Sequence, residues 1–260
     1  MKRLLLVAAL CAAATAFGQG LYWQSKTTGT VGESTSETYI MPRMMKVIHH
    51  GGDGSILIIR LDREVFWDLD PAEKTYSEMT FAQMEEMMNR MAGKMDAAMK
   101  KMREEMSNMT EEQRKMMMEM MGGQMPGMSP ESTAPVKVNK TGEKKTISGY
   151  ACTKYVVRMG DQTLSTMWVT KDVKGFAAMA EDWKKLSQRM ARLAERFGKG
   201  LADAYKDIDG FPMQTEMSGI VTTVTKLEQR STPASEFEIP AGYKKVKSKL
   251  EENMQQMEEE

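Results

Sequence analysis

The sequence predicts an α+β protein with one antiparallel sheet and with helices packed on one face of that sheet. Runs of β-prone residues with short turns between them fill residues 21–76 and resume after residue 136. Two stretches with helical periodicity, over 81–121 and 176–198, interrupt these runs. Adjacent strands joined by short turns favour antiparallel pairing, and helices inserted between them should cover one face of the sheet.

The beginning of the chain reads as a cleavable signal peptide over residues 1–16. Lys2 and Arg3 precede an apolar run from Leu4 to Ala14, and small residues up to Ala16 supply a cleavage site. The apolar run is too short to span a bilayer and no later stretch matches it, so no stable membrane insertion is expected. The protein is therefore predicted to be exported and periplasmic.

The net charge disfavours two classes of partner, and the cysteine content disfavours an internal disulfide. Without Lys2 and Arg3, 34 of the 36 basic residues remain beside 36 acidic ones, which gives a net charge of −2. Neither nucleic acid nor an anionic membrane is therefore a favoured partner. Cleavage also removes Cys11 and leaves Cys152 alone, so no internal disulfide is expected. Cys152 lies in a strand-like run, and we interpret it as a small buried hydrophobe.

Residues 21–76 have the pattern of a β-meander. Asp53-Gly54 favours a tight hairpin turn. The continuous apolar run from Ile56 to Ile59 suits a strand that is covered on both faces, whereas Val65, Trp67 and Leu69 alternate on one side of the next strand. The expected strands are Leu21–Thr30, Ser34–Met41, Arg43–His49, Ser55–Leu61, Glu64–Leu69 and Lys74–Ser77.

A methionine-rich block follows, with seventeen of the 29 methionines between Met79 and Met128. From Met84 onward the thioethers recur about every 3.6 residues, the period of one helical face. Thr80 and Gln83 fit a capping box at the helix start. A single helix would be too long for a compact domain, so we expect a break near Ser107 and a helical hairpin that occupies residues 80–122.

The second half of the chain returns to strands around another amphipathic helix. Phe176, Met179 and Trp183 begin an apolar periodicity that continues to Phe197. We expect a single domain over 17–243, ending in an extended piece at Glu236–Tyr243, and a charged C-terminal tail over 244–260 that forms a frayed helix. The expected strands are Val136–Ser148, Tyr150–Met159, Thr163–Thr170, Met213–Met217 and Ile220–Arg230.

No catalytic signature is present, so the sequence predicts a protein that is not an enzyme and has no cofactor. Histidine occurs only as His49-His50, and neighbours on a strand point to opposite faces, which disfavours a shared metal. We interpret the pair as solvated turn residues, and no metal ligands are assigned.

The methionine stripe is the candidate functional feature, and several interpretations stay open. It can be ordinary core, an adaptable apolar surface for acyl chains, a set of thioether ligands for Cu(I), or a sacrificial target of oxidation. In the leading hypothesis the stripe lines a groove between sheet and helices. The residues predicted to line it are Met84, Met88, Met91, Met95, Met99, Met102, Trp183, Leu186 and Met190.

Several stretches resemble an uncharacterised bacterial family of exported, methionine-rich proteins, known only as a domain of unknown function. Asp70-Pro71 after Trp67 and the closing Pro240-Ala-Gly-Tyr243 are also similar to periplasmic lipoprotein carriers of the LolA and LolB kind. That similarity implies an open half-barrel of antiparallel strands, closed by helices over an apolar cavity, with no catalytic residues. The stretches that carry the family resemblance are Thr75–Thr80, Gly149–Val156, Trp168–Lys171, Gly210–Met213 and Ser231–Tyr243.

Together these features predict a non-enzymatic periplasmic protein with a curved sheet that binds a lipid or another hydrophobic or amphipathic molecule. Cu(I) binding or buffering is one alternative, and a structural or partner-binding role in the envelope is another. The sequence names neither the ligand nor a protein partner.

Overall fold

The computed structural model describes residues 20–30, 32–51, 54–107, 109–110, 112, 135–177, 179–184 and 208–248. The predicted signal peptide and the second half of the predicted hairpin lie outside these ranges, apart from isolated residues near 110. Most of the second predicted helix and the end of the charged tail are outside them as well.

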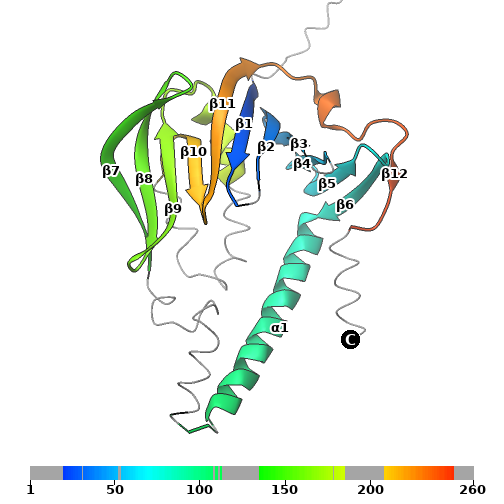
Figure 1. Ribbon diagram of the computed structural model, residues 1–260. Helices are drawn as coiled ribbons and strands as arrows, with labels where there is room; N and C mark the ends of the chain where they lie inside the picture. Colours follow the sequence, from blue (N-terminus) through cyan, green and yellow to red (C-terminus); the bar gives the residue numbers. More distant parts are fainter. Residues whose placement is uncertain are drawn as a thin grey trace, which may run out of the picture.

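Twelve strands in the described residues form one sheet, in the order β12-β6-β5-β4-β3-β2-β1-β11-β10-β9-β8-β7. Neighbouring strands are antiparallel except for β12 and β6. Figure 1 shows a curved sheet that does not close, as predicted. The strands are β1 (Gly20–Thr28), β2 (Ser34–Met41), β3 (Met44–His50), β4 (Ile56–Arg60), β5 (Val65–Asp70), β6 (Thr75–Thr80), β7 (Val136–Ile147), β8 (Tyr150–Met159), β9 (Gln162–Thr170), β10 (Phe211–Met217), β11 (Ile220–Arg230) and β12 (Lys244–Lys245).

Most of these strands match the sequence predictions, and the exceptions lie near the end of the chain. The extended piece predicted at Glu236–Tyr243 is wrong in part, because Ala234–Phe237 forms a 3-10 helix. Lys244–Lys245, predicted to begin the charged helical tail, instead forms β12 beside β6. The backbone N–H of Lys244 donates to the carbonyl of Lys74 at 2.9 Å, a long-range contact that local sequence does not encode.

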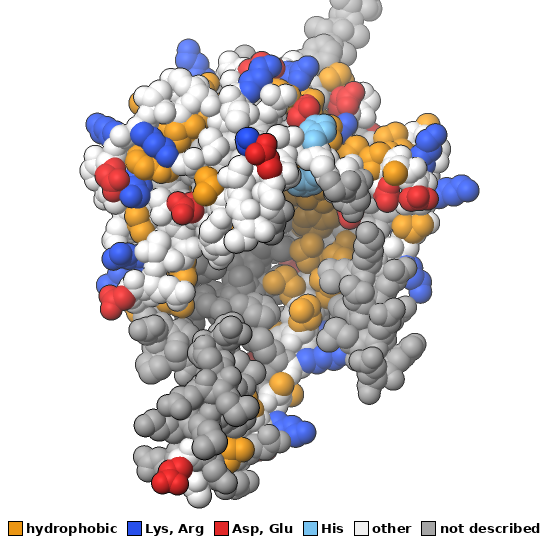
Figure 2. Space-filling model, viewed as in Figure 1, with side chains coloured by type: hydrophobic (Ala, Val, Ile, Leu, Met, Phe, Trp, Pro, Cys, Tyr) orange, Lys and Arg blue, Asp and Glu red, His pale blue; other side chains and the backbone are white. Residues whose placement is uncertain are grey.

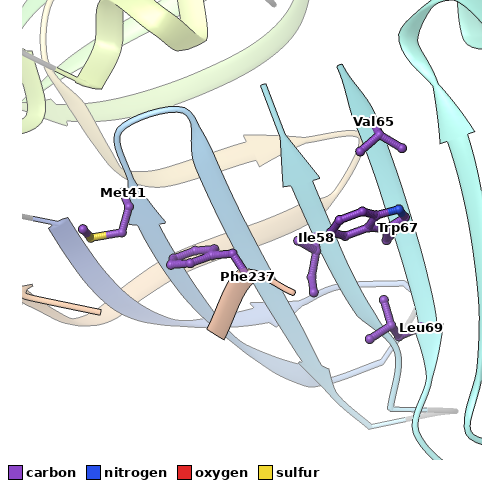
Figure 3. Close-up of a cluster of buried hydrophobic side chains, with 6 residues drawn as sticks. All are labelled: Met41, Ile58, Val65, Trp67, Leu69 and Phe237. Carbon is purple, nitrogen blue, oxygen red and sulfur yellow. The ribbon is translucent and has the colours of Figure 1, made fainter. Parts of the chain in front are cut away.

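The core on one face of the sheet follows from the alternation predicted for β5. Val65, Trp67 and Leu69 are buried there, and Ile58 from β4 packs with them. Phe237, with no exposed surface, fills the middle of this cluster (Figure 3). Ile59, the neighbour of Ile58, is buried on the opposite face, so β4 is covered on both sides at this point, as predicted.

The segment that carries Phe237 is residues 231–248, which we call the C-terminal strap. It leaves β11 in the middle of the sheet and pairs through β12 with β6, so it crosses the face of β1–β5 that bears Trp67. Arg60 holds it in place: Nη1 donates to the carbonyl of Phe237 at 3.3 Å and to Glu238 Oε1 at 2.5 Å. The strap therefore completes the core on what we call the strap-side face.

Helix α1 (Phe81–Ser107) begins directly after β6, and the predicted capping box is present. The Thr80 N–H donates to Gln83 Oε1 at 2.8 Å, and the Gln83 N–H donates to Thr80 Oγ1 at 3.1 Å. The Phe81 ring lies 4.6 Å from the ring of Phe66 on β5. Beyond this first turn α1 runs away from the sheet (Figure 1).

The predicted helical cover is only partly seen. The structure ends α1 at Ser107, where a break was predicted, but a helical hairpin is not shown. Of the second predicted helix, the described residues 176–177 and 179–184 are helical. Within the described ranges, no helix combines the length and apolarity needed to cross a membrane.

Candidate functional site: the helix-side face of the sheet

One transverse row of the sheet is apolar across six consecutive strands. Residues that stand opposite each other in register share a face of the sheet. Following the register from β1 to β6 joins one apolar side chain from each strand, and we call these residues the apolar row. They are Leu21, Ile40, Met45, Ile59, Phe66 and Met79.

The apolar row lies on the face opposite the strap. Phe66 alternates with Val65 and Trp67, which belong to the strap-side core. The contact between Phe66 and Phe81 places the start of α1 on the same side as the row. We therefore call this side the helix-side face.

Burial of the row changes from one end to the other. At the β1–β2 end, Leu21 and Ile40 are 2% and 3% exposed and pack with Met179. Trp183 and Phe176 cover the same cluster. At the β3–β6 end, by contrast, Met45, Phe66 and Met79 are only partly buried. Among the described residues, the 173–183 segment thus covers the row at the β1–β2 end, whereas Met45, Phe66 and Met79 keep some exposed surface toward the other end.

The next rows of the helix-side face become progressively more polar. Val47 and Leu57 face each other in the second row, where they are followed by Asp68. The third row begins with Ser25 and Ser36, whose hydroxyl oxygens are 2.8 Å apart, and continues to the exposed His49. Figure 2 shows a hollow on this side, lined by hydrophobic side chains between the two histidines and α1. This gradient gives the hollow an apolar end toward α1 and a polar rim.

The predicted groove residues on α1 differ in exposure. Met84, Met88 and Met102 are partly buried, whereas Met91 is 50% exposed. Met87, which the predicted stripe omitted, is 8% exposed and is therefore a more buried thioether than any of these. The side chains of Met95, Met99, Leu186 and Met190 lie outside the described residues.

Trp183 is the one predicted site residue from the second helix that the structure describes. It packs against Leu21, Ile40 and Met179, and its buried Nε1–H has no hydrogen-bond partner among the described residues. It therefore covers the β1–β2 end of the apolar row.

Sequence reasoning assigned the site to helices and missed the sheet residues that form the open part of the row. Alternation offered the signal, because residues between Val65, Trp67 and Leu69 must point to the other face. Phe66 is one such residue. Its partners Ile59 and Met79 follow only from the strand register, which the sequence does not state.

Other side chains that could carry chemistry have structural roles. Cys152 is 2% exposed, and burial raises the pKa of its thiol. His49 and His50 are exposed at the end of β3, a strand end rather than a turn. No cluster of three or more His, Cys, Asp or Glu side chains in the described part of the chain could hold a metal ion.

A separate small pocket of about 220 Å³ adjoins the β1 end of the row. Leu21, Val173 and Leu227 contribute its apolar lining. Polar groups around it bond to one another, as when Gln229 Nε2 donates to the carbonyl of Lys174 at 3.2 Å. Ligand pockets usually exceed about 300 Å³, so this pocket is a poor candidate compared with the open hollow.

A polar network on the strap-side face provides a first testable prediction. Tyr22, 4% exposed, donates from its hydroxyl to Glu37 at 2.9 Å, and Tyr39 donates to the same oxygen at 3.0 Å. Burial and the bond to Glu37 raise the pKa of Tyr22 from 10.0 to about 12. A raised pKa stabilises the fold below the unfolded value, so stability should fall as pH rises from about 10 to 12.

Urea denaturation at several alkaline pH values would measure this loss, with tyrosinate absorbance recorded in parallel. The Tyr22→Phe variant should lose a tyrosine whose pKa is raised, and its stability should vary less above pH 10. Tyr22→Phe and wild-type curves of equal slope in this range would contradict the assignment.

The fold and this face define a protein with an open antiparallel sheet and one apolar hollow, and sequence comparison gives its family. The family model described as "Domain of unknown function (DUF4412)" matches residues 82–243. The chain belongs to this family, which confirms the resemblance predicted from the sequence. A comparison with curated protein sequences gives no match.

Solved structures with similar folds share little sequence with this chain. An uncharacterized conserved protein from Thermus thermophilus is 8% identical with a TM-score of 0.43, and the match covers 87% of this chain and 90% of that one. PNGF-II is 8% identical with a TM-score of 0.41, covering 91% and 32%. MucB in complex with MucA(peri) is 9% identical with a TM-score of 0.36, covering 88% and 57%.

Proposed function

We propose that this protein is a non-enzymatic binding protein that holds a lipid or another amphipathic molecule against the helix-side face. The observation that carries the proposal is the apolar row, which is continuous across six strands and keeps exposed surface at Met45, Phe66 and Met79. Apolar side chains at the strap-side core are buried by Phe237, but Phe66 and Met79 on the other face keep exposed surface. Contiguous exposed apolar surface beside a hollow is typical of binding sites.

The gradient of polarity supports an amphipathic occupant. An acyl chain placed along Met45, Phe66 and Met79 would extend toward Met84 and Met88 on α1. Its polar end would then lie toward the rim formed by Ser25, Ser36 and His49. Met side chains suit such a ligand because they are unbranched and adapt to varied shapes.

The predicted signal peptide supports export to the periplasm, where a binding protein of this kind would act on lipids or other envelope molecules. The residues of that segment lie outside the described ranges. N-terminal sequencing of the protein from the periplasmic fraction would test cleavage after Ala16, and a retained leader would contradict it.

The binding proposal is tested on the full chain purified from the periplasm. Native mass spectrometry should show a bound molecule, and the delipidated protein should take up a fluorescent fatty acid. An apo mass together with no uptake would refute the proposal.

Two neighbouring residues on β3 give a matched pair of variants. Val47 points to the helix-side face and Ile48 to the strap side, so Val47→Lys places a charge in the hollow and Ile48→Lys does not. Val47→Lys should weaken fatty-acid binding by about tenfold or more, since a buried ammonium is costly. Ile48→Lys should leave binding nearly unchanged. If Val47→Lys fails to fold, Leu57→Gln in the same row serves instead.

Cu(I) binding by thioethers is a second candidate, supported by spacing and exposure on α1. Met87 and Met91 are four residues apart, as are Met84 and Met88, so pairs of sulfur atoms can share a helical face. A titration of Cu(I) against a competing chelator separates the candidates, because copper binding should not respond to Val47→Lys. Failure to compete at micromolar copper would exclude it. A partner-docking role of the exposed Met91 side stays a prediction.

A further inference from the structure

We propose that Met91 is a site of oxidation to methionine sulfoxide, and that this modification makes the α1 side of the hollow polar and releases its occupant. The oxidation of Met91 does not depend on the proposed function. The release of an occupant rests on the proposed function.

The first argument concerns which sulfur atoms an oxidant can reach. The described thiol, Cys152, is 2% exposed, its S–H donates to the carbonyl of Tyr150 at 3.4 Å, and burial keeps it in the less reactive thiol form. Met213, Met179 and Met41 are buried in the sheet cores at 0%, 3% and 5% exposure. Among the described sulfur atoms, those of the surface methionines are therefore the ones that an oxidant reaches most easily.

The second argument is the difference in exposure among the methionines of α1. Met91 is 50% exposed, Met84 and Met88 are partly buried, and Met87 is 8% exposed. Met91 follows Met87 by four residues and Met88 by three, so all three thioethers belong to one side of the helix. An oxidant from solvent meets this side first at Met91.

The chemistry needs only a two-electron oxidant of the peroxide class. A sulfur lone pair attacks one peroxide oxygen, the O–O bond breaks, and the S–O bond forms. The second oxygen leaves as water after proton transfer, so sulfur is oxidised by two electrons and the peroxide is reduced. The product is a polar sulfoxide on a side chain that was apolar.

Oxidation of Met91 should not destabilise the sheet, because Met91 lies far from the contact between α1 and the sheet. It lies ten residues after Phe81, about 15 Å along the helix at about 1.5 Å per residue. Phe81 is the residue through which α1 contacts the Phe66 ring. Sulfoxide at Met91 should therefore make this side of α1 polar without opening either sheet core.

Met217 provides an internal reference, since it is 56% exposed but lies at the end of β10, opposite Ile220. The full chain would be treated with limiting hydrogen peroxide and its peptides analysed by mass spectrometry over time. Met91 and Met217 should be oxidised at least about tenfold faster than Met87, because susceptibility follows exposure. A Met91 rate equal to or below that of Met87 would overturn the site.

The effect on binding is measured with the fluorescent fatty acid after a peroxide treatment that oxidises Met91 and Met217 fully and leaves Met87 reduced. Oxidised wild type and oxidised Met217→Leu should bind about tenfold more weakly than before treatment, whereas oxidised Met91→Leu should keep its affinity. Equal losses in wild type and Met91→Leu would overturn the release. If no untreated protein takes up fatty acid, the proposed function and the release fail together, and the order of oxidation rates still decides the site.

Discussion

Phe237→Ala is expected to lower the free energy of unfolding by about 3–5 kcal/mol, the usual cost of removing a fully buried aromatic ring. The ring has no exposed surface and packs among Met41, Ile58 and Trp67, so its loss would leave a cavity in the strap-side core. Urea denaturation followed by circular dichroism measures the change. Amide hydrogen exchange would show whether the strap opens before the rest of the sheet.

Val246→Ala is the matched control for this prediction, because Val246 belongs to the same strap but is 46% exposed. Its side chain should contribute within about 0.5 kcal/mol. Its backbone N–H, which donates to the carbonyl of Tyr76 at 2.9 Å, is kept in the variant. Equal destabilisation by the two substitutions would mean that the strap is not anchored through the Phe237 ring.

Arg60→Met should be the second strongly destabilising change, by about 3 kcal/mol. The Arg60 side chain is 6% exposed, and it donates to both carboxylate oxygens of Asp62 at 2.9 and 2.7 Å and to Glu238 in the strap. Removing the guanidinium leaves these carboxylates without their main partner at the edge of the core. The exposed Arg63 also binds Glu238, at 2.8 Å, so Arg63→Met is the control and should cost at most about 1 kcal/mol.

The Arg60–Asp62 ion pair also predicts how the stability of the fold depends on pH. The hydrogen bond from Arg60 holds the pKa of Asp62 below its ordinary value of 3.8. A lowered carboxyl pKa adds stability above the unfolded value, and this stability is lost as pH falls toward the folded one. The difference in unfolding free energy between wild type and Arg60→Met should therefore be constant near neutral pH and shrink below about pH 4. A difference that grows on acidification would contradict this account.

These predictions concern one face of the sheet, and they bear on the function of the other. The strap closes the strap-side face with Phe237 and Arg60. On the helix-side face, the described residues Met179 and Trp183 cover the β1–β2 end of the apolar row. Because the strap supplies a complete core, β3–β6 can keep a partly exposed apolar face, which is what a binding surface for an amphipathic molecule requires.

Local sequence by itself determined the elements whose signals lie within a few residues of one another. The alternation of Val65, Trp67 and Leu69 predicted a strand with one buried side, and these residues are buried as expected. The Thr80–Gln83 capping box predicted the start of α1, and both of its hydrogen bonds are present. Such features depend on backbone geometry that repeats every two or every 3.6 residues, so a short window of sequence suffices.

The tertiary structure alone decided which residues meet across the fold. Ile59, Phe66 and Met79 form a row only because β4, β5 and β6 pair in one register, and a shift of one residue would turn each side chain to the other face. Phe237 lies in a segment without periodicity, and it is buried among side chains of β4 and β5 that are distant in sequence. Pairing register and long-range packing set these features, and neither is written in local sequence.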